Sequence, residues 1–170
     1  MKKLDNASER IEKKAVIFLG EYIHSIDPQR RVAVPKTWRV KGVENKFYLL
    51  PGRHKSLQII PIDVFAGLLD KIRGVSFADP SASVALGQLG SMAQECECDG
   101  QGRIGIPQRL VDYAGLGEKA VLVGALSTAQ IWSEESWRNV QSSDDQVLDV
   151  IQKLTGKSDS LADILKGIKS

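Results

Sequence analysis

The sequence contains few of the residues on which disulfide-linked and zinc-binding proteins depend. Its only two cysteines, Cys96 and Cys98, are separated by a single residue, a spacing poorly suited to a disulfide between them. Structural zinc sites usually need two spaced pairs of ligands, and the two histidines, His24 and His54, do not supply the second pair. We therefore expect no metal and no cofactor, and we interpret both cysteines as small core residues of a strand. Free thiols suit a reducing cytoplasm.

Long hydrophobic runs are missing as well. No stretch approaches the roughly 18 consecutive apolar residues of a membrane span, and no apolar signal segment follows the N-terminal lysines. The sequence also lacks a nucleophile–base pair, a glycine-rich phosphate loop before a helix and a pair of catalytic carboxylates. These absences argue against a membrane protein and against an enzyme.

What is present fits one soluble globular unit of 170 residues, with 42% hydrophobic residues and a net charge of +2. The charge is unevenly distributed. Residues 22–56 contain eight basic and two acidic residues, a net charge of +6, whereas residues 94–130 contain three basic and five acidic residues, a net charge of −2. The basic part favours a polyanionic partner, although a solvated charged face would have the same composition.

A short motif occurs twice in the chain, 72 positions apart. The stretch Glu95–Pro107 has the pattern of a strand, a tight turn, a second strand and a proline that can open a helix, and Tyr22–Pro35 repeats it. The matching positions are Asp27 and Asp99, Gln29 and Gln101, Arg31 and Arg103, Pro35 and Pro107, Gln58 and Gln130, Ile59 and Ile131, and Phe65 and Trp137. Because the register persists beyond the motif, we interpret the chain as a tandem duplication whose repeats pack on each other.

Each predicted turn contains one aspartate that can organise its backbone. Asp27 and Asp99 are expected to accept hydrogen bonds from backbone N–H groups about two residues further on. Gly100 and Gly102 allow a positive φ in the second turn. Arg30 occupies the position that matches Gly102, which predicts a steric cost or a different conformation in the first turn.

The remaining pattern predicts a mainly β protein with short helices, of the α+β class. Short helices are expected after each motif proline, and a helix that begins at Asp79 and Pro80 should run toward Met92. The domain organisation that we expect is an N-terminal extension at 1–19, a first repeat at 20–73, a linker helix at 74–93, a second repeat at 94–140 and a polar, amphipathic tail at 141–170.

Several short motifs resemble the MraZ family of transcriptional regulators, over roughly Gly20 to Val140. They are His24–Asp27, Arg31–Pro35, Glu95–Glu97, Asp99–Pro107, Tyr113–Leu116, Val121–Gly124 and Ile131–Ser133. The repeat motif of that family is Asp-x-Lys-Gly-Arg. Here Gln29 and Gln101 stand where lysine is usual, and Arg30 stands where glycine is usual.

The resemblance implies a fold and a function. The fold would be a pseudo-twofold, swapped-hairpin β-barrel of the AbrB type, built from the two tandem repeats, which contacts DNA from its turns. The function would be sequence-specific regulation of transcription, as a repressor of the division and cell-wall gene cluster. The partners would be repeated elements in double-stranded promoter DNA and further copies of the chain in a homo-oligomeric ring. The location would be the cytoplasm, in association with the nucleoid.

Physical chemistry supports DNA recognition at the turns. A fixed arginine can pair bidentately with guanine and a glutamine with adenine, while cations on the following helices can hold phosphates. The candidate DNA-binding residues are Arg31, Arg103, Arg30, Gln29, Gln101, Lys36, Arg39 and Arg109, and the residues that structure the turns are Asp27, Asp99, Gly100 and Gly102. In the alternative interpretation, Arg31 and Arg103 only form ion pairs with the aspartates of their own turns.

Two other functions stay open at this stage. One is a DNA-binding antitoxin of the wider AbrB superfamily, which the polar C-terminal segment favours and the tandem repeats disfavour. The other is a structural or interaction ring that has lost DNA binding, for which the altered motif of the first repeat is the argument.

Overall fold

A computed structural model describes residues 15–74 and 78–155. The chain divides into two compact units, Met1–Ser136 and Trp137–Ser170, and the first of them contains both turns. In the second unit, α5 (Asp144–Thr155) is amphipathic, with Val147, Val150 and Leu154 exposed. No helix within the described ranges is long and apolar enough to cross a membrane.

The described elements follow the duplication. The first repeat contains β1 (Glu21–Ser25), β2 (Arg31–Ala33), the 3-10 helix η1 (Lys36–Trp38), β3 (Lys46–Pro51), η2 (Arg53–Lys55), β4 (Leu57–Pro61) and α1 (Ile62–Arg73). After α2 (Pro80–Met92), the second contains β5 (Gln94–Glu97), β6 (Arg103–Gly105), α3 (Gln108–Ala114), β7 (Lys119–Ala125), β8 (Thr128–Trp132) and α4 (Glu134–Val140). Equivalent elements occur in the same order, and β2 and β6 begin 72 positions apart, as do η1 and α3.

The two repeats exchange their first strands. β1 pairs with β7 of the second repeat, and β5 pairs with β3 of the first, so the six-stranded sheet has the order β1-β7-β8-β4-β3-β5. β2 and β6 pair only with each other in a separate ribbon. All of these pairs are antiparallel, and the expected mixed α+β class is confirmed.

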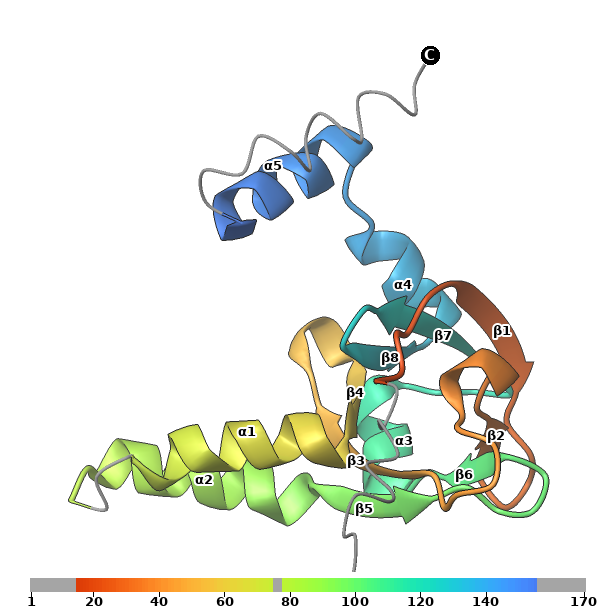
Figure 1. Ribbon diagram of the computed structural model, residues 1–170, viewed down its shortest axis with the longest axis horizontal. Coiled ribbons are helices and arrows are strands. Elements are labelled where there is room, and N and C mark those ends of the chain that lie inside the picture. The colour runs from red at the N-terminus through yellow and green to blue at the C-terminus, as the bar shows by residue number, and fades with distance from the viewer. Residues whose placement is uncertain (1–14, 75–77, 156–170) are drawn as a thin grey trace, which may run out of the picture. The chain divides into compact units, whose positions relative to one another are not determined.

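The closed barrel that the resemblance implies is not formed by the described strands. β1 and β5 remain the edges of the six-stranded sheet. β2 and β6 are only three residues long, and they use their ladder hydrogen bonds on each other, so they do not join the two edges. In Figure 1, β1, β2 and β6 lie on one side of this unit, and α1 and α2 extend from the other.

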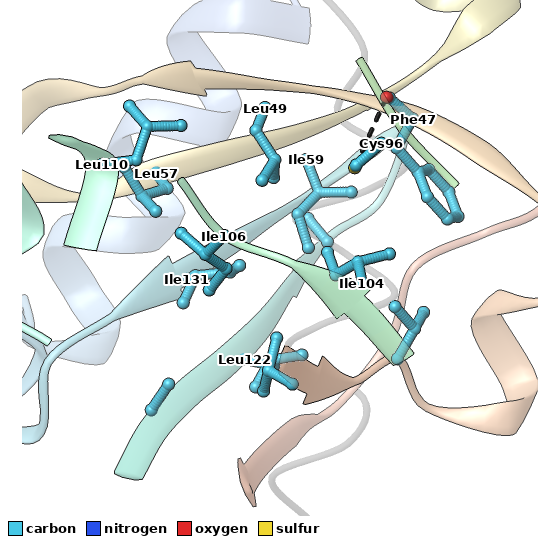
Figure 2. Close-up of a cluster of buried hydrophobic side chains, with 14 of the residues drawn as sticks. Phe47, Leu49, Leu57, Ile59, Cys96, Ile104, Ile106, Leu110, Leu122 and Ile131 are labelled. Carbon is cyan, nitrogen blue, oxygen red and sulfur yellow. Dashed lines mark hydrogen bonds between the residues drawn. The ribbon is translucent and has the colours of Figure 1, made fainter. Parts of the chain in front are cut away.

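One hydrophobic core is shared by the two repeats, which is why neither repeat stands as a separate body. Figure 2 shows side chains from β3, β4, β6, β7 and β8 converging in it. Fully buried members include Leu49, Leu57, Ile59, Ile104, Leu122 and Ile131. Cys96 also faces the core, with its Sγ 3.5 Å from the Phe47 carbonyl oxygen, and burial raises the pKa of its thiol to about 12.

The core extends further toward the N-terminus than the sequence pattern suggests. Phe18 is fully buried, and it exchanges two backbone hydrogen bonds with Leu126, of 2.8 and 3.0 Å. Gly124 leaves room for this segment, because a Cβ there would lie 2.4 Å from the Phe18 carbonyl oxygen. Trp38 Nε1 donates to the carbonyl oxygen of Leu19 at 2.9 Å. Residues just before Gly20 therefore belong to the packed unit.

Candidate functional site

The first turn is organised by the carboxylate of Asp27. Its Oδ1 accepts from the backbone N–H groups of Gln29 (2.9 Å) and Arg31 (2.8 Å), and its Oδ2 accepts from Arg31 Nε at 2.7 Å. The N–H of Arg30 closes the turn on the Asp27 carbonyl oxygen at 2.8 Å. This is the side-chain-to-backbone arrangement that the motif predicts.

The second turn repeats the first almost bond for bond. Asp99 Oδ1 accepts from the N–H groups of Gln101 (2.9 Å) and Arg103 (3.0 Å), and Oδ2 accepts from Arg103 Nε at 2.9 Å. The N–H of Gly102 donates to the Asp99 carbonyl oxygen at 2.9 Å. The 72-residue offset therefore holds for the hydrogen bonds as well as for the sequence.

The first turn does not change conformation to accommodate Arg30. Its φ is +61°, close to the +76° of Gly102, so a non-glycine residue occupies the left-handed region. Two hydrogen bonds join Arg30 to Ile106. Ile106 N–H donates to the Arg30 carbonyl oxygen at 2.8 Å, and Arg30 Nε donates to the Ile106 carbonyl oxygen at 3.2 Å. The backbone bond has an equivalent in the second turn, where Val34 N–H donates to the Gly102 carbonyl oxygen at 2.9 Å, so only the side-chain bond is specific to Arg30.

The role expected of Gly100 is not found. Gly100 has no positive φ, and a Cβ there would meet nothing within 4 Å. Gly102 is the glycine that the second turn requires.

The two turns lie beside each other and share their charges. The β2–β6 register places Arg31 opposite Gly105 and Ala33 opposite Arg103. Arg103 Nη1 lies 3.7 Å from Asp27 Oδ2, and Arg31 Nη1 lies 4.0 Å from Asp99 Oδ2. Two carboxylates and two guanidinium groups thus form one cluster with no net charge, which we call the paired-turn cluster (Asp27, Arg31, Asp99, Arg103).

Both carboxylates of the paired-turn cluster are held in the ionised form. The pKa of Asp99 is lowered to about 2, first by the backbone hydrogen bond from Arg103 and then by its side chain. The pKa of Asp27 is also lowered, mainly by the backbone hydrogen bond from Arg31. Each arginine therefore faces a permanent counter-ion at neutral pH.

The structure thus contains the ion pairs of the alternative interpretation. Arg103 binds Asp99 through both Nε and Nη2, each at 2.9 Å, and its side chain is 26% exposed. Arg31 is bound through Nε and is 34% exposed. Any base that these arginines contact must share them with the aspartates.

Arg39 lies against the second turn, although it belongs to the first repeat. A Cβ built on Gly102 would lie 2.2 Å from Arg39 Nη1 and 2.3 Å from Arg39 Cζ. Arg39 directly follows η1, and its N–H donates to the Lys36 carbonyl oxygen at 3.1 Å. Because this contact joins distant parts of the chain, the local motif does not predict it.

The other predicted contact residues are distributed unevenly. Gln29, Gln101 and Lys36 are exposed at or near the turns. Arg109 is exposed too, but its Nη2 donates to the Ser91 carbonyl oxygen at the end of α2. Arg109 is therefore attached to the helical side and not to the paired-turn cluster.

A second basic feature lies at the tip of the β3–β4 hairpin. Arg53, His54 and Lys55 are all exposed, and the last two have positive φ values of 55° and 65°. Lys55 Nζ lies 4.9 Å from the ring centroid of Tyr113, whose hydroxyl donates to the Gly52 carbonyl oxygen at 2.5 Å. The sequence signal that could have predicted this basic tip is the run of three basic residues after Gly52. Among the described residues, no group of three or more potential ligands is placed to hold a metal ion.

The fold and the site define a class: a duplicated, strand-exchanged α+β module that presents two equivalent Asp–Arg turns side by side. The family model described as "MraZ protein, putative antitoxin-like" matches residues 90–155.

Named relatives cover more of the chain. A "Transcriptional regulator MraZ" of Desulfitobacterium hafniense is 39% identical over 72% of this chain and 85% of the relative. Proteins with the same name from Clostridium beijerinckii and Natranaerobius thermophilus are 36% and 37% identical, over 81% and 74% of this chain and 96% and 87% of theirs. The chain belongs to the MraZ family, which confirms the resemblance seen in its motifs.

Proposed function

We propose that this protein is a sequence-specific DNA-binding regulator of transcription, and that it contacts DNA with the face formed by its two turns. The observation that carries the proposal is the side-by-side placement of two turns with the same hydrogen bonds. The relatives' name, which is that of a regulator and not of an enzyme, supports it. The reciprocal pairing of β1 with β7 and of β5 with β3 supports a swapped-hairpin relationship of the AbrB type.

In this proposal the paired-turn cluster fixes the backbone, and the exposed side chains at the tips contact the DNA. Gln29 and Gln101 extend from the two turns and can each pair with an adenine edge. Arg31 can contact guanine with Nη2, which lies in neither of its ion pairs with the aspartates. All three guanidinium nitrogens of Arg103 lie within 3.7 Å of an aspartate oxygen, so Arg103 can contact guanine only with the second N–H of Nη1 or Nη2. Arg30 and Lys36 are exposed cations for phosphates.

We also propose that the protein works as a homo-oligomer on repeated promoter elements, and that it represses the division and cell-wall gene cluster in the nucleoid. A second copy of the chain would cover an apolar patch around edge strand β1. Ile17 (61% exposed), Leu19, Ile23 and Leu126 (65% exposed) lie there, next to the Phe18–Leu126 bridge. An edge strand with exposed apolar residues is a ready site for another chain. Several weak DNA contacts would then act together.

Light scattering on the protein as it elutes from a size-exclusion column measures its molar mass and so tests whether it is an oligomer. We expect a mass that is a multiple of 18.6 kDa, and we expect Ile23→Lys combined with Leu126→Lys to reduce it. Val43→Lys is the matched control, because Val43 is similarly exposed (58%) but lies in the loop before β3. A monomeric wild type at micromolar concentration would contradict the assembly and leave the DNA proposal standing.

The DNA proposal is tested by a gel shift of the purified protein on DNA from upstream of its own gene. We expect a shifted band that survives an excess of random DNA of equal length. Equal competition by random DNA would mean that binding is not sequence-specific. Absence of binding by a folded wild-type protein would favour the interaction ring without DNA.

A further inference from the structure

We propose that each turn receives one additional guanidinium group for a DNA phosphate, and that the two turns obtain it in different ways. The first turn carries its own, Arg30, whereas the second receives Arg39 from the other repeat, in the space that Gly102 leaves open. This inference rests on the proposed DNA-binding function and adds to it a phosphate-binding pair with a defined architecture.

The charges of the site show why additional cations beside the turns matter. The paired-turn cluster has two negative and two positive groups, so it does not attract a polyanion by itself. Attraction to DNA depends mainly on cations placed near phosphates. Arg30 and Arg39 are the arginines that lie directly against the turns without an aspartate partner among the described residues.

The missing side chain of Gly102 leaves the space in which the Arg39 guanidinium group lies. Gly102 is buried, and even an alanine Cβ would overlap the guanidinium group at 2.2–2.3 Å. Positive φ alone does not explain a glycine here, because Arg30 adopts a similar φ in the other turn. The absence of a side chain at position 102 is therefore needed for space as well as for conformation.

The guanidinium group of Arg39 packs against the backbone at Gly102. Its Nε is buried and has no hydrogen-bond partner in the part of the chain that the structure describes. The positive charge of Arg39 also acts on Cys98, which directly precedes Asp99. Burial raises the pKa of that thiol to about 11, and the Arg39 charge opposes the rise.

The duplication shows that the two arrangements replace each other. Position 30 corresponds to 102 and position 39 to 111, so the first turn combines Arg30 with Val111 and the second combines Gly102 with Arg39. Arg30 Nε reaches across to the Ile106 carbonyl oxygen of the other repeat, and Val111 packs against the core. The matching positions thus hold one arginine and one small or apolar residue in each case, with the arginine at position 30 for the first turn and at position 39 for the second.

A double-mutant cycle tests whether the two arrangements can replace each other. Its combined variant gives the second turn the residue types of the first, an arginine at position 102 and a valine at position 39. The variants are Arg39→Val, Gly102→Arg and the two combined, measured against wild type for the dependence of log K on log salt concentration. Arg39→Val should lower the magnitude of the slope by about 0.9, on cognate and random DNA alike, because one phosphate contact is lost. The combined variant should recover the wild-type slope, since the side chain introduced at position 102 can follow the conformation of Arg30. Gly102→Arg alone should bind less well than the combined variant, because two guanidinium groups then compete for one space.

Arg73→Val is the matched control, because Arg73 pairs with Asp70 on α1, away from the turns, and should not change the slope. Melting curves establish that each variant is folded. If the combined variant does not fold, Arg39→Lys replaces it in the test, and this variant should keep the slope because it keeps the charge. An unchanged slope in folded Arg39→Val would overturn the inference, as would folded double variants with no recovery. If wild type itself does not bind DNA, the proposed function fails instead.

Discussion

The two repeats form nearly identical turns, but their exposed surfaces differ. Asp27 and Asp99 accept equivalent hydrogen bonds, and both turns keep a positive φ at the same position. The β3–β4 hairpin, by contrast, ends in three exposed basic residues, whereas the equivalent β7–β8 hairpin ends in Leu126.

The edges of the sheet differ in the same way. β1 exposes Ile23, and the position that matches it in β5 is Glu95, which is charged. The shared geometry of the turns thus coincides with different residues on the exposed surfaces of the two repeats. The comparison teaches that the turn is the geometry that both repeats keep, while the exposed residues around it differ, with basic residues at the β3–β4 tip and apolar residues at Ile23 and Leu126.

The largest expected effect tests whether the repeats share one core. Ile59 and Ile131 are equivalent and fully buried, so Ile59→Ala and Ile131→Ala should each cost about 2–5 kcal/mol of unfolding free energy. Because the strands are exchanged, each variant should shift one cooperative denaturant transition, seen alike by circular dichroism and tryptophan fluorescence at fixed protein concentration. Val43→Ala, at an exposed position, should cost less than about 0.5 kcal/mol. Two separate transitions would show that the repeats unfold independently.

A smaller effect distinguishes the cation of the first turn from the residues that would read bases. Arg30→Ala should weaken binding to cognate and random DNA by the same factor and lower the salt slope, as expected for a phosphate contact. Binding isotherms at three salt concentrations measure this. The control is Arg73→Ala, because Arg73 pairs with Asp70 on α1, away from the turns. A loss confined to cognate DNA would instead make Arg30 a base contact.

The pH dependence of the unfolding free energy at acid pH tests the two carboxylates, Asp27 and Asp99. Their pKa values are lowered in the folded protein, so the stability that they contribute is present above their unfolded value of 3.8. It is lost as the pH falls, and for Asp99 the loss continues down to about pH 2. Asp99→Asn should therefore be less stable than wild type at pH 7, and the difference should shrink between pH 4 and about pH 2. Urea unfolding across this range checks it; a difference independent of pH would contradict the charge argument.

The smallest expected effect concerns the positions where the repeats carry His24 and Cys96. Since neither they nor their neighbours form a metal-binding group in the described residues, a chelator should leave the melting temperature and DNA binding unchanged. Thermal melts and gel shifts with and without the chelator measure this. Recovery of a lost function by added zinc would mean that these residues bind metal.

Much of the site follows from local sequence. The Asp–x–x–x–Arg spacing predicts both turns, because a short carboxylate side chain reaches backbone N–H groups only a few residues away. The N-cap of α2 by Asp79 is predictable for the same reason, and it is present with hydrogen bonds to Ser81 and Ala82.

Long-range contacts account for what the sequence does not predict. Alternation identifies β1 as a strand but does not say that its partner is β7. Phe18 becomes a core residue only because Gly124 and Leu126 receive it from another part of the chain. Two further contacts join residues far apart in sequence. Arg39 packs against Gly102, and Arg109 donates a hydrogen bond to Ser91.

The most direct test of the paired turns is the binding of Arg103→Ala, compared with wild type, to cognate and to random DNA at equal salt. The account predicts a loss of about 1–3 kcal/mol on the cognate site and a smaller loss on random DNA, since Arg103 both contacts a base and holds its turn. Unchanged binding by a folded Arg103→Ala protein would contradict recognition of DNA through these turns.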